Sequence, residues 1–207
     1  MATPIRLVAG LGNPGREYAR TRHNAGFWFA DALAGKLAAA FAPESRFSAD
    51  VAKAGGVRIV KPAPFMNLSG RAVAAVARFF AIAPEEILVV HDELDLKCGD
   101  AKMKFGGGHA GHNGLRDIAA HLGTADFWRL RIGIGHPRDS DLTQQEVADY
   151  VLRPPRAEDF DLIDGAIERA LGAWPAIAAG DMERAMMALH TRGKTSDGNG
   201  PAPPARL

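Results

Sequence analysis

The sequence has 207 residues, a length that fits one ordinary domain. Hydrophobic residues make up 47% of it and charged residues 24%, with a formal net charge of +1, which excludes a disordered, collagen-like or coiled-coil chain. The single cysteine, Cys98, excludes an internal disulfide and indicates a reducing compartment. There is neither an apolar run of about 18 residues nor a signal-peptide pattern, so we expect a globular, cytoplasmic protein without a membrane segment.

Strand and helix patterns alternate along the first half of the chain. Short apolar or alternating runs indicate strands, and longer runs with apolar residues three and four positions apart indicate helices. In chain order we expect a strand over 5–9, a helix over 27–41, a strand over 57–61, a helix that is capped by Asn67 or Ser69 and reaches Phe80, and a buried strand over 87–90.

The same alternation continues in the second half. We expect a strand over 102–105, a glycine-rich loop over 106–114, a helix over 115–122, a strand over 128–134, a short helix opened by a capping box at 143–146, a helix from Arg156 to a break near Pro175, and a last helix from Asp181 to His190. Interleaved strands and helices predict one α/β domain over residues 1–191. Residues 192–207 are rich in Gly, Pro and Ser and predict a disordered tail.

Charge is distributed unevenly along the sequence. Cations outnumber acids between residues 97 and 138, whereas acids dominate between residues 139 and 168. This asymmetry suggests a face that meets a polyanion such as nucleic acid. For the charge asymmetry taken alone, a solvated surface of mixed charge is the favoured interpretation.

Residues 10–15 fit the GxGxxG pattern of dinucleotide-binding proteins and follow a predicted strand, so a nicotinamide or flavin enzyme is one alternative. Residues 106–111 fit the same pattern, which shows how easily a glycine-rich chain meets it. Pro14 lies inside the first loop, and Asp31, at about the expected distance, lies in a helix instead of at a strand end. Tight turns between strand and helix are the favoured interpretation of these glycines.

Metal sites and covalent nucleophiles find less support. His109, His112 and the adjacent pair His91 and Asp92 are ligand types that zinc or iron accepts, but no HExxH motif or cysteine pair accompanies them. No GxSxG motif is present, and nothing around Cys98 indicates a nucleophile. We therefore expect no metal and no cofactor.

A set of polar residues lies where predicted elements begin or end, which is where α/β proteins place their sites. A single asparagine in such a place is most simply a cap or turn former. Together, however, an imidazole can take a proton from water, a carboxylate can orient that imidazole, and amides can donate to an oxyanion or pair with peptide backbone. The set comprises Asn13, His23, Asn24, Asn67, Asp92 and Asn113.

The motifs around these residues resemble the successive signatures of the bacterial peptidyl-tRNA hydrolase family. They are LVAGLGNPG at 7–15, TRHNAG at 21–26, KPAPFMNLSG at 61–70, HDELDL at 91–96, GGGHAGHNG at 106–114 and RLRIGIGHP at 129–137. The resemblance extends in order over about residues 5–190. It implies a monomeric α/β domain with a mixed, twisted central sheet flanked by helices. It also implies an esterase of translation and ribosome rescue that releases peptides from the terminal ribose of tRNA.

The resemblance further implies a role for each residue that fits a family motif. His23 corresponds to the catalytic base, Asp92 to the carboxylate that orients it, and Asn113 to the residue that helps hold the attacking water or the oxyanion. The residues implied to contact the peptide end of the substrate are Asn13, Tyr18, Met66 and Asn67. The residues implied to contact tRNA are Asn24, Lys104, His112 and Arg131, with Lys104 and Arg131 on the 5′ phosphate and His112 in a loop that gates the cleft.

The sequence leaves two alternatives from other functional classes. One is an RNA-binding module on the same fold that uses a basic face without catalysis, which the presence of His23 and Asp92 disfavours. The other is the nucleotide-dependent oxidoreductase, which the absorbance of a bound cofactor would reveal.

Overall fold

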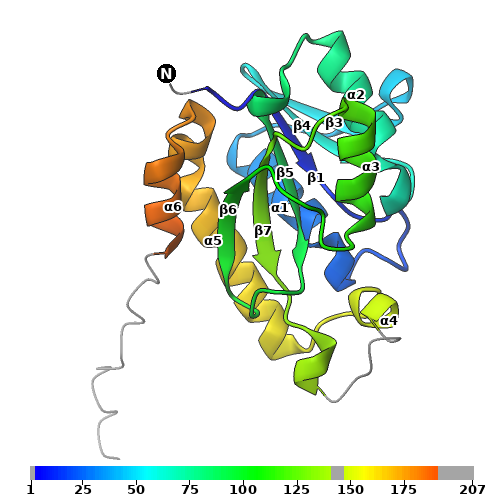
Figure 1. Ribbon diagram of the computed structural model, residues 1–207, viewed down its shortest axis with the longest axis vertical. Helices are drawn as coiled ribbons and strands as arrows, with labels where there is room; N and C mark the ends of the chain where they lie inside the picture. Colours follow the sequence, from blue (N-terminus) through cyan, green and yellow to red (C-terminus); the bar gives the residue numbers. More distant parts are fainter. Residues whose placement is uncertain (1–2, 141–146, 191–207) are drawn as a thin grey trace, which may run out of the picture.

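The computed structural model describes residues 3–140 and 147–190, and within these ranges the strands form one seven-stranded sheet (Figure 1). The strands are β1 (Leu7–Gly10), β2 (Ala42–Glu44), β3 (Ala49–Ala54), β4 (Val57–Pro62), β5 (Ile87–Glu93), β6 (Ala101–Phe105) and β7 (Trp128–Gly133). Their order across the sheet is β2-β3-β4-β1-β5-β7-β6. β1 pairs parallel with β4 and β5, and β5 with β7, whereas β2–β3, β3–β4 and β6–β7 pair antiparallel. The sheet is therefore mixed, as predicted.

Helices cover both faces of this sheet (Figure 1). They are α1 (Ala25–Lys36), α2 (Ser69–Phe79), α3 (Asn113–Leu122), α4 (Val147–Val151), α5 (Ala157–Ala179) and α6 (Met182–His190). Val90 of β5 belongs to a core with α1, α5 and α6, and its neighbour Val89 to a second core with α2 and α3. Successive strand residues point to opposite faces, so β5 is buried along its whole length.

The predicted α/β alternation is confirmed, with ends shifted by a few residues, but β2 and β3 were not predicted. β3 reads ADVAKA, and alanine is not typical of strands. It forms because its whole length pairs antiparallel with β4, which buries Val51 and Ala52. Strand formation here is set by the partner strand more than by local preference.

The predicted break at Pro175 is wrong, because α5 continues through this residue to Ala179. A proline inside a helix removes one hydrogen bond and costs about 3 kcal/mol. In return α5 buries a long apolar stripe against the sheet, including Ile163, Trp174 and Ile177. Packing on both sides of Pro175 keeps the helix continuous.

The predicted helix caps are partly confirmed. Asp181 caps α6 by accepting a backbone hydrogen bond at 3.2 Å. Neither Asn67 nor Ser69 caps α2. The carboxylate of Asp117 in α3 instead accepts from the amide of Gly70 at 2.7 Å, so the start of α2 is satisfied by the neighbouring helix.

Two predictions lie outside the described residues. They are the capping box at 143–146 and the disordered tail at 192–207. In the described ranges, no helix is long and apolar enough to cross a membrane.

Replacing Gly26 with alanine should destabilise the fold by about 3 kcal/mol or more. Gly26 lies in the first turn of α1, and a Cβ there would overlap the carbonyl oxygen of Val90 and the backbone of Leu11. Urea unfolding measures the loss. Gly35→Ala in the same helix is the matched control, because a Cβ at Gly35 meets no atom within 4 Å and should stabilise the helix by about 1 kcal/mol. Equal stability of the two variants would contradict this account of the α1 contact.

Candidate active site

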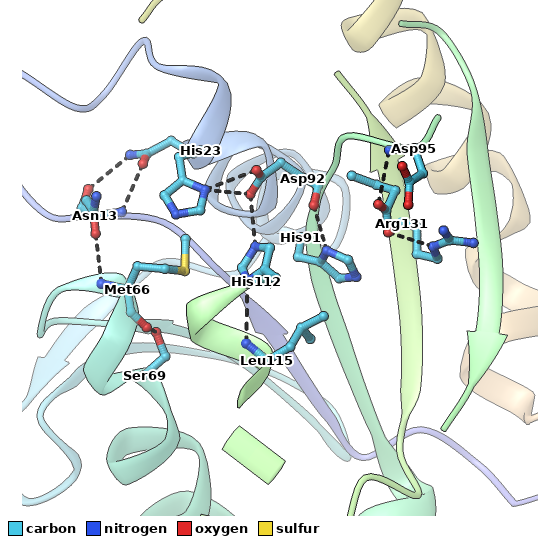
Figure 2. A network of polar contacts seen from close by, with 12 residues as sticks. Asn13, His23, Met66, Ser69, His91, Asp92, Asp95, His112, Leu115 and Arg131 are labelled. Atoms are coloured by element: carbon cyan, nitrogen blue, oxygen red, sulfur yellow. Dashed lines mark hydrogen bonds and ion pairs between the residues drawn. The ribbon is translucent and has the colours of Figure 1, made fainter. Parts of the chain in front are cut away.

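Three of the predicted site residues come from segments that meet where the parallel strands β1 and β5 end. Asn13 follows β1, His23 lies in a 3-10 turn (Arg22–Asn24) that leads into α1, and Asp92 is near the end of β5. The carboxyl ends of parallel strands meet at one edge of a sheet, which is the usual place for a site in this class of fold. Figure 2 shows these side chains around one point, together with Met66 and His112.

His23 and Asp92 form a hydrogen-bonded pair. Nδ1 of His23 lies 2.9 Å from Oδ1 and 3.0 Å from Oδ2 of Asp92. A carboxylate only accepts hydrogen bonds, so Nδ1 carries the proton and donates it. In the neutral imidazole, Nε2 is then the proton acceptor. Because His23 lines a cleft, this arrangement suits a base that works on a water molecule.

The surroundings of the pair favour an imidazole that takes up a proton readily. Burial alone would lower the pKa of His23, but the Asp92 carboxylate outweighs burial and raises that pKa above its ordinary value of 6.5. Burial acts to raise the pKa of Asp92, yet His23 and His112 hold it well below its usual range. At neutral pH, the imidazole of His23 is therefore hydrogen-bonded to a negatively charged Asp92 carboxylate.

Two further histidines adjoin this pair. Nε2 of His112 lies 3.1 Å from Oδ1 of Asp92, and Nδ1 of His91 lies 2.7 Å from the backbone carbonyl oxygen of Asp92. The His112 ring centre is 5.2 Å from that of His23 and 4.9 Å from that of His91. Burial lowers the pKa of His91 to about 3, so this imidazole is neutral. Its Nε2 is buried without a hydrogen-bond partner in residues 3–140 and 147–190.

Asn13 is held from two sides. Its Oδ1 accepts from the amide of Met66 at 2.8 Å. The side chain of Asn24 accepts from the Asn13 amide at 2.9 Å and donates to the Asn13 carbonyl at 3.0 Å. The Asn24 bonds hold the backbone of Asn13, and the Met66 bond engages Oδ1 of its side chain, so Nδ2 is the atom that can donate to a substrate.

These residues line a cleft of about 820 Å³. Asn67 and Asn113 lie on its walls and are exposed, and Met66 is buried beside them. Apolar side chains complete the lining, among them Phe65 and Leu152. A cleft of this size with an apolar wall and a few convergent polar groups is typical of a binding site for a small molecule or a peptide segment.

Comparison with known proteins agrees with this geometry. The family model of peptidyl-tRNA hydrolase matches residues 7–197. The chain belongs to the peptidyl-tRNA hydrolase family. Its relatives include the peptidyl-tRNA hydrolases of Azoarcus sp., 56% identical over 92% of this chain and 87% of that protein, and of Neisseria gonorrhoeae, 56% identical over 93% of this chain and 100% of that protein. The crystal structure of peptidyl-tRNA hydrolase from Acinetobacter baumannii has a TM-score of 0.86 and 42% identity, covering 92% of this chain and 97% of that one.

The residues that the family resemblance assigns to the peptide end lie in or beside the cleft. Asn13, Met66 and Asn67 line it. Tyr18 packs edge-on against Phe65, which belongs to the lining, with ring centres 6.1 Å apart. The structure therefore brings together all four residues that are expected to meet the peptide.

Asn24 has a different place from the one expected for a tRNA contact. The residue is 2% exposed, and both polar atoms of its side-chain amide bond the backbone of Asn13. A buried amide with both atoms engaged has no group for a phosphate or a base. We therefore treat Asn24 as the residue that positions Asn13 in this peptidyl-tRNA hydrolase.

Lys104 and Arg131 lie on a common face of the sheet and are not part of the cleft lining. In the antiparallel ladder of β6 and β7, Lys104 lies opposite Arg129 and Lys102 opposite Arg131, so the four cations share one face. Lys104 is exposed, whereas Arg131 donates to the carboxylate of Glu93 at 2.8 Å. Glu93 was not predicted as a site residue, although strand alternation after His91 could have placed it beside these cations.

Arg22 is a second residue near the site that was not predicted from the sequence. It is 6% exposed, and its guanidinium donates to the carbonyls of Tyr150, Arg153 and Pro154 at 3.1 to 3.3 Å. These bonds attach the end of α4, which lines the cleft, to the turn that carries His23. Its position directly before His23 was the available signal.

His23, Asp92 and His112 could also hold a metal ion, since their ligand atoms all lie within 4.8 Å of one another. This set differs from the one that the sequence suggested, which included His91 and His109. The same atoms are joined here by hydrogen bonds of 2.9 and 3.1 Å. A cation would have to displace the proton on Nδ1 of His23, so the arrangement fits a proton network better than a metal site.

Proposed function

We propose that this chain hydrolyses the ester bond that joins a nascent peptide to the terminal ribose of tRNA, with His23 as the general base. The observation that carries the proposal is the His23–Asp92 pair, which fixes the proton on Nδ1 and presents Nε2 in the cleft. Family membership supports the substrate class. General-base assistance is worth about 10²- to 10⁴-fold, which suits an ester with a good leaving group.

In the proposed reaction, a water molecule gives a proton to Nε2 of His23 while its oxygen attacks the ester carbonyl carbon. The carbonyl oxygen becomes an oxyanion, which the amide groups of Asn13 and Asn113 can stabilise by donating hydrogen bonds. The bond from carbon to the ribose oxygen then breaks, and His23 returns its proton to that oxygen. The products are the free peptide acid and tRNA with an intact terminal ribose.

Peptide recognition falls to the amides of the cleft. Nascent peptides share no fixed side chain, so a general enzyme must hold their main-chain groups. Asn67 and Asn113 are suited to this, since each amide both donates and accepts. Met66 and Phe65 supply an adaptable apolar surface that does not demand one sequence.

The remaining elements of the proposal concern partners and cellular setting. Sequence-independent phosphate contacts at Lys104 and Arg131 suit an enzyme that accepts every tRNA. We propose a cytoplasmic, monomeric enzyme without metal or cofactor, in keeping with the single Cys98 and with hydrogen-bonded histidines at the site.

Hydrolysis of an N-blocked aminoacyl-tRNA by the purified chain tests the proposal. The reaction is run with EDTA, and unblocked aminoacyl-tRNA is the comparison substrate. Release of amino acid from the blocked form alone supports it. Binding of tRNA without turnover would favour the silent RNA-binding module, and an absorbing bound cofactor would favour the oxidoreductase.

Lys104→Ala should raise KM for full-length substrate. It should also reduce the slope of log KM against log salt concentration by about one, the value expected for the loss of one phosphate contact. Lys104 is exposed on the basic face of β6 and β7, where a phosphate oxygen can approach it. A minimal substrate without the 5′ phosphate should be cleaved normally. Lys53→Ala, which removes an exposed cation from β3, is the matched control. An equal loss of cleavage efficiency on the full-length and the minimal substrate would exclude a phosphate contact by Lys104.

A further inference from the structure

His112 has both ring nitrogens engaged by other groups. Nδ1 accepts from the backbone amide of Leu115 at 3.4 Å, which caps α3. An acceptor nitrogen carries no proton, so in the neutral ring the proton is on Nε2, which donates to Oδ1 of Asp92 at 3.1 Å. Asp92 therefore receives two imidazole donors, one from His23 and one from His112 (Figure 2).

This engagement is hard to reconcile with a tRNA contact. The His112 side chain is 10% exposed, and the expected contact would need a ring nitrogen that is already used. The geometry instead places His112 beside the base, because His112 and His23 both bond Oδ1 of Asp92 and their ring centres are 5.2 Å apart. Two donors on one carboxylate fix its orientation and share its negative charge.

We propose that His112 is a positioning residue of the hydrolytic site, which holds Asp92 in place and limits how strongly Asp92 attracts a proton to His23. The inference rests on the proposed function, because it concerns the basicity of the proposed catalytic base. It also gives the segment 106–112 a chemical role. That segment is fastened at one end by Arg129, which donates to the carbonyls of Gly107 and Gly108, and at the other by His112.

The base has titratable neighbours on β5 and on the segment before α3. Asp92 faces His23 directly, His112 contacts the ring of His23, and His91 contacts the ring of His112. Arg129 adds a positive charge near His91. His91 stays neutral, so removal of the His112 donor acts on His23 through Asp92. A carboxylate with one donor fewer stabilises the imidazolium of His23 more strongly, so the pKa of His23 must rise.

Two variants of His112 separate its two bonds. Asparagine places its amide oxygen near the position of Nδ1, so His112→Asn keeps the cap of α3 and loses the donor to Asp92. Glutamine places its amide nitrogen near the position of Nε2, so His112→Gln keeps the donor and loses the cap. Long-range ¹H–¹⁵N NMR through a pH titration measures the pKa of His23, and the acid limb of kcat/KM reports the same change in turnover.

We expect His112→Asn to raise the pKa of His23 by about half a unit or more and to move the acid limb upward by the same amount. His112→Gln should leave that pKa near the wild-type value while lowering the thermal stability. His109→Asn is the matched control, because His109 lies in the same segment and bonds the amide of Gly111 instead of Asp92. It should leave the pKa of His23 unchanged.

An unchanged pKa in His112→Asn, or equal shifts in the Asn and Gln variants, would overturn the proposal. The wild-type spectrum gives a test that needs no variant, since the proposal requires the Nε2–H tautomer of His112 and the opposite tautomer refutes it. Failure of the wild-type chain to cleave N-blocked aminoacyl-tRNA would instead refute the proposed function, and it would leave the NMR result on Asp92 and its two donors standing.

Discussion

His23→Ala should lower kcat by roughly 100-fold or more while leaving tRNA affinity nearly unchanged, because it removes the proton acceptor and few binding contacts. His23 lines the cleft and its Nδ1 is bound to Asp92, so Nε2 is the ring nitrogen left to accept a proton from water. Single-turnover cleavage of N-blocked aminoacyl-tRNA measures the chemical step, and filter binding measures affinity. In the wild type, the acid limb of kcat/KM should lie above pH 6.5, since Asp92 raises the pKa of the base.

The matched control for this variant is His121→Ala. His121 lies in the last turn of α3, is outside the cleft lining, and pairs with Asp117 at 3.4 Å. Its loss should leave kcat near the wild-type value. Near-normal turnover in His23→Ala would remove His23 from the mechanism, and an equal loss in both variants would indicate a general effect of histidine removal on the fold.

The sequence predicted the scaffold of the site because local patterns determine it. The buried run of β5 and the turn after β1 place Asp92 and Asn13 at strand ends, and parallel pairing of those strands brings the two ends together. His23 could be assigned from its motif and from the chemistry of imidazole. The structure adds the tautomer, since the contact of Nδ1 with Asp92 indicates which nitrogen is free to act as the base.

Contacts between distant segments were beyond sequence reasoning. Asn24 follows His23 directly, and successive residues of a 3-10 turn point about 120° apart, so one side chain reaches the cleft while the other is buried. The bond between His112 and Asp92 joins a loop to a strand, and no spacing rule predicts it. Pro175 shows the same limit, because tertiary packing on α5 outweighs the local preference of proline.

Asp92→Asn should lower kcat by roughly 100- to 10,000-fold with the fold retained. The carboxylate accepts from both imidazoles, whereas an asparagine amide offers one acceptor and one donor group, and its NH2 can bind Nδ1 and place the proton on Nε2, where it blocks the base. The negative charge that stabilises the imidazolium during proton transfer is lost as well. Both effects act on the chemical step, so KM should change little.

The pH profile of Asp92→Asn gives the sharper test. Asp92 raises the pKa of His23 and burial lowers it, so removing the charge leaves burial and moves the pKa of His23 downward. The base works in its unprotonated form, so the residual activity should show an acid limb at lower pH than in the wild type, opposite to the shift expected for His112→Asn. NMR titration of His23 measures the same displacement without substrate. A full rate with an unmoved acid limb would make Asp92 a structural residue, and a reduced rate with an unmoved limb would mean that its charge does not act through His23.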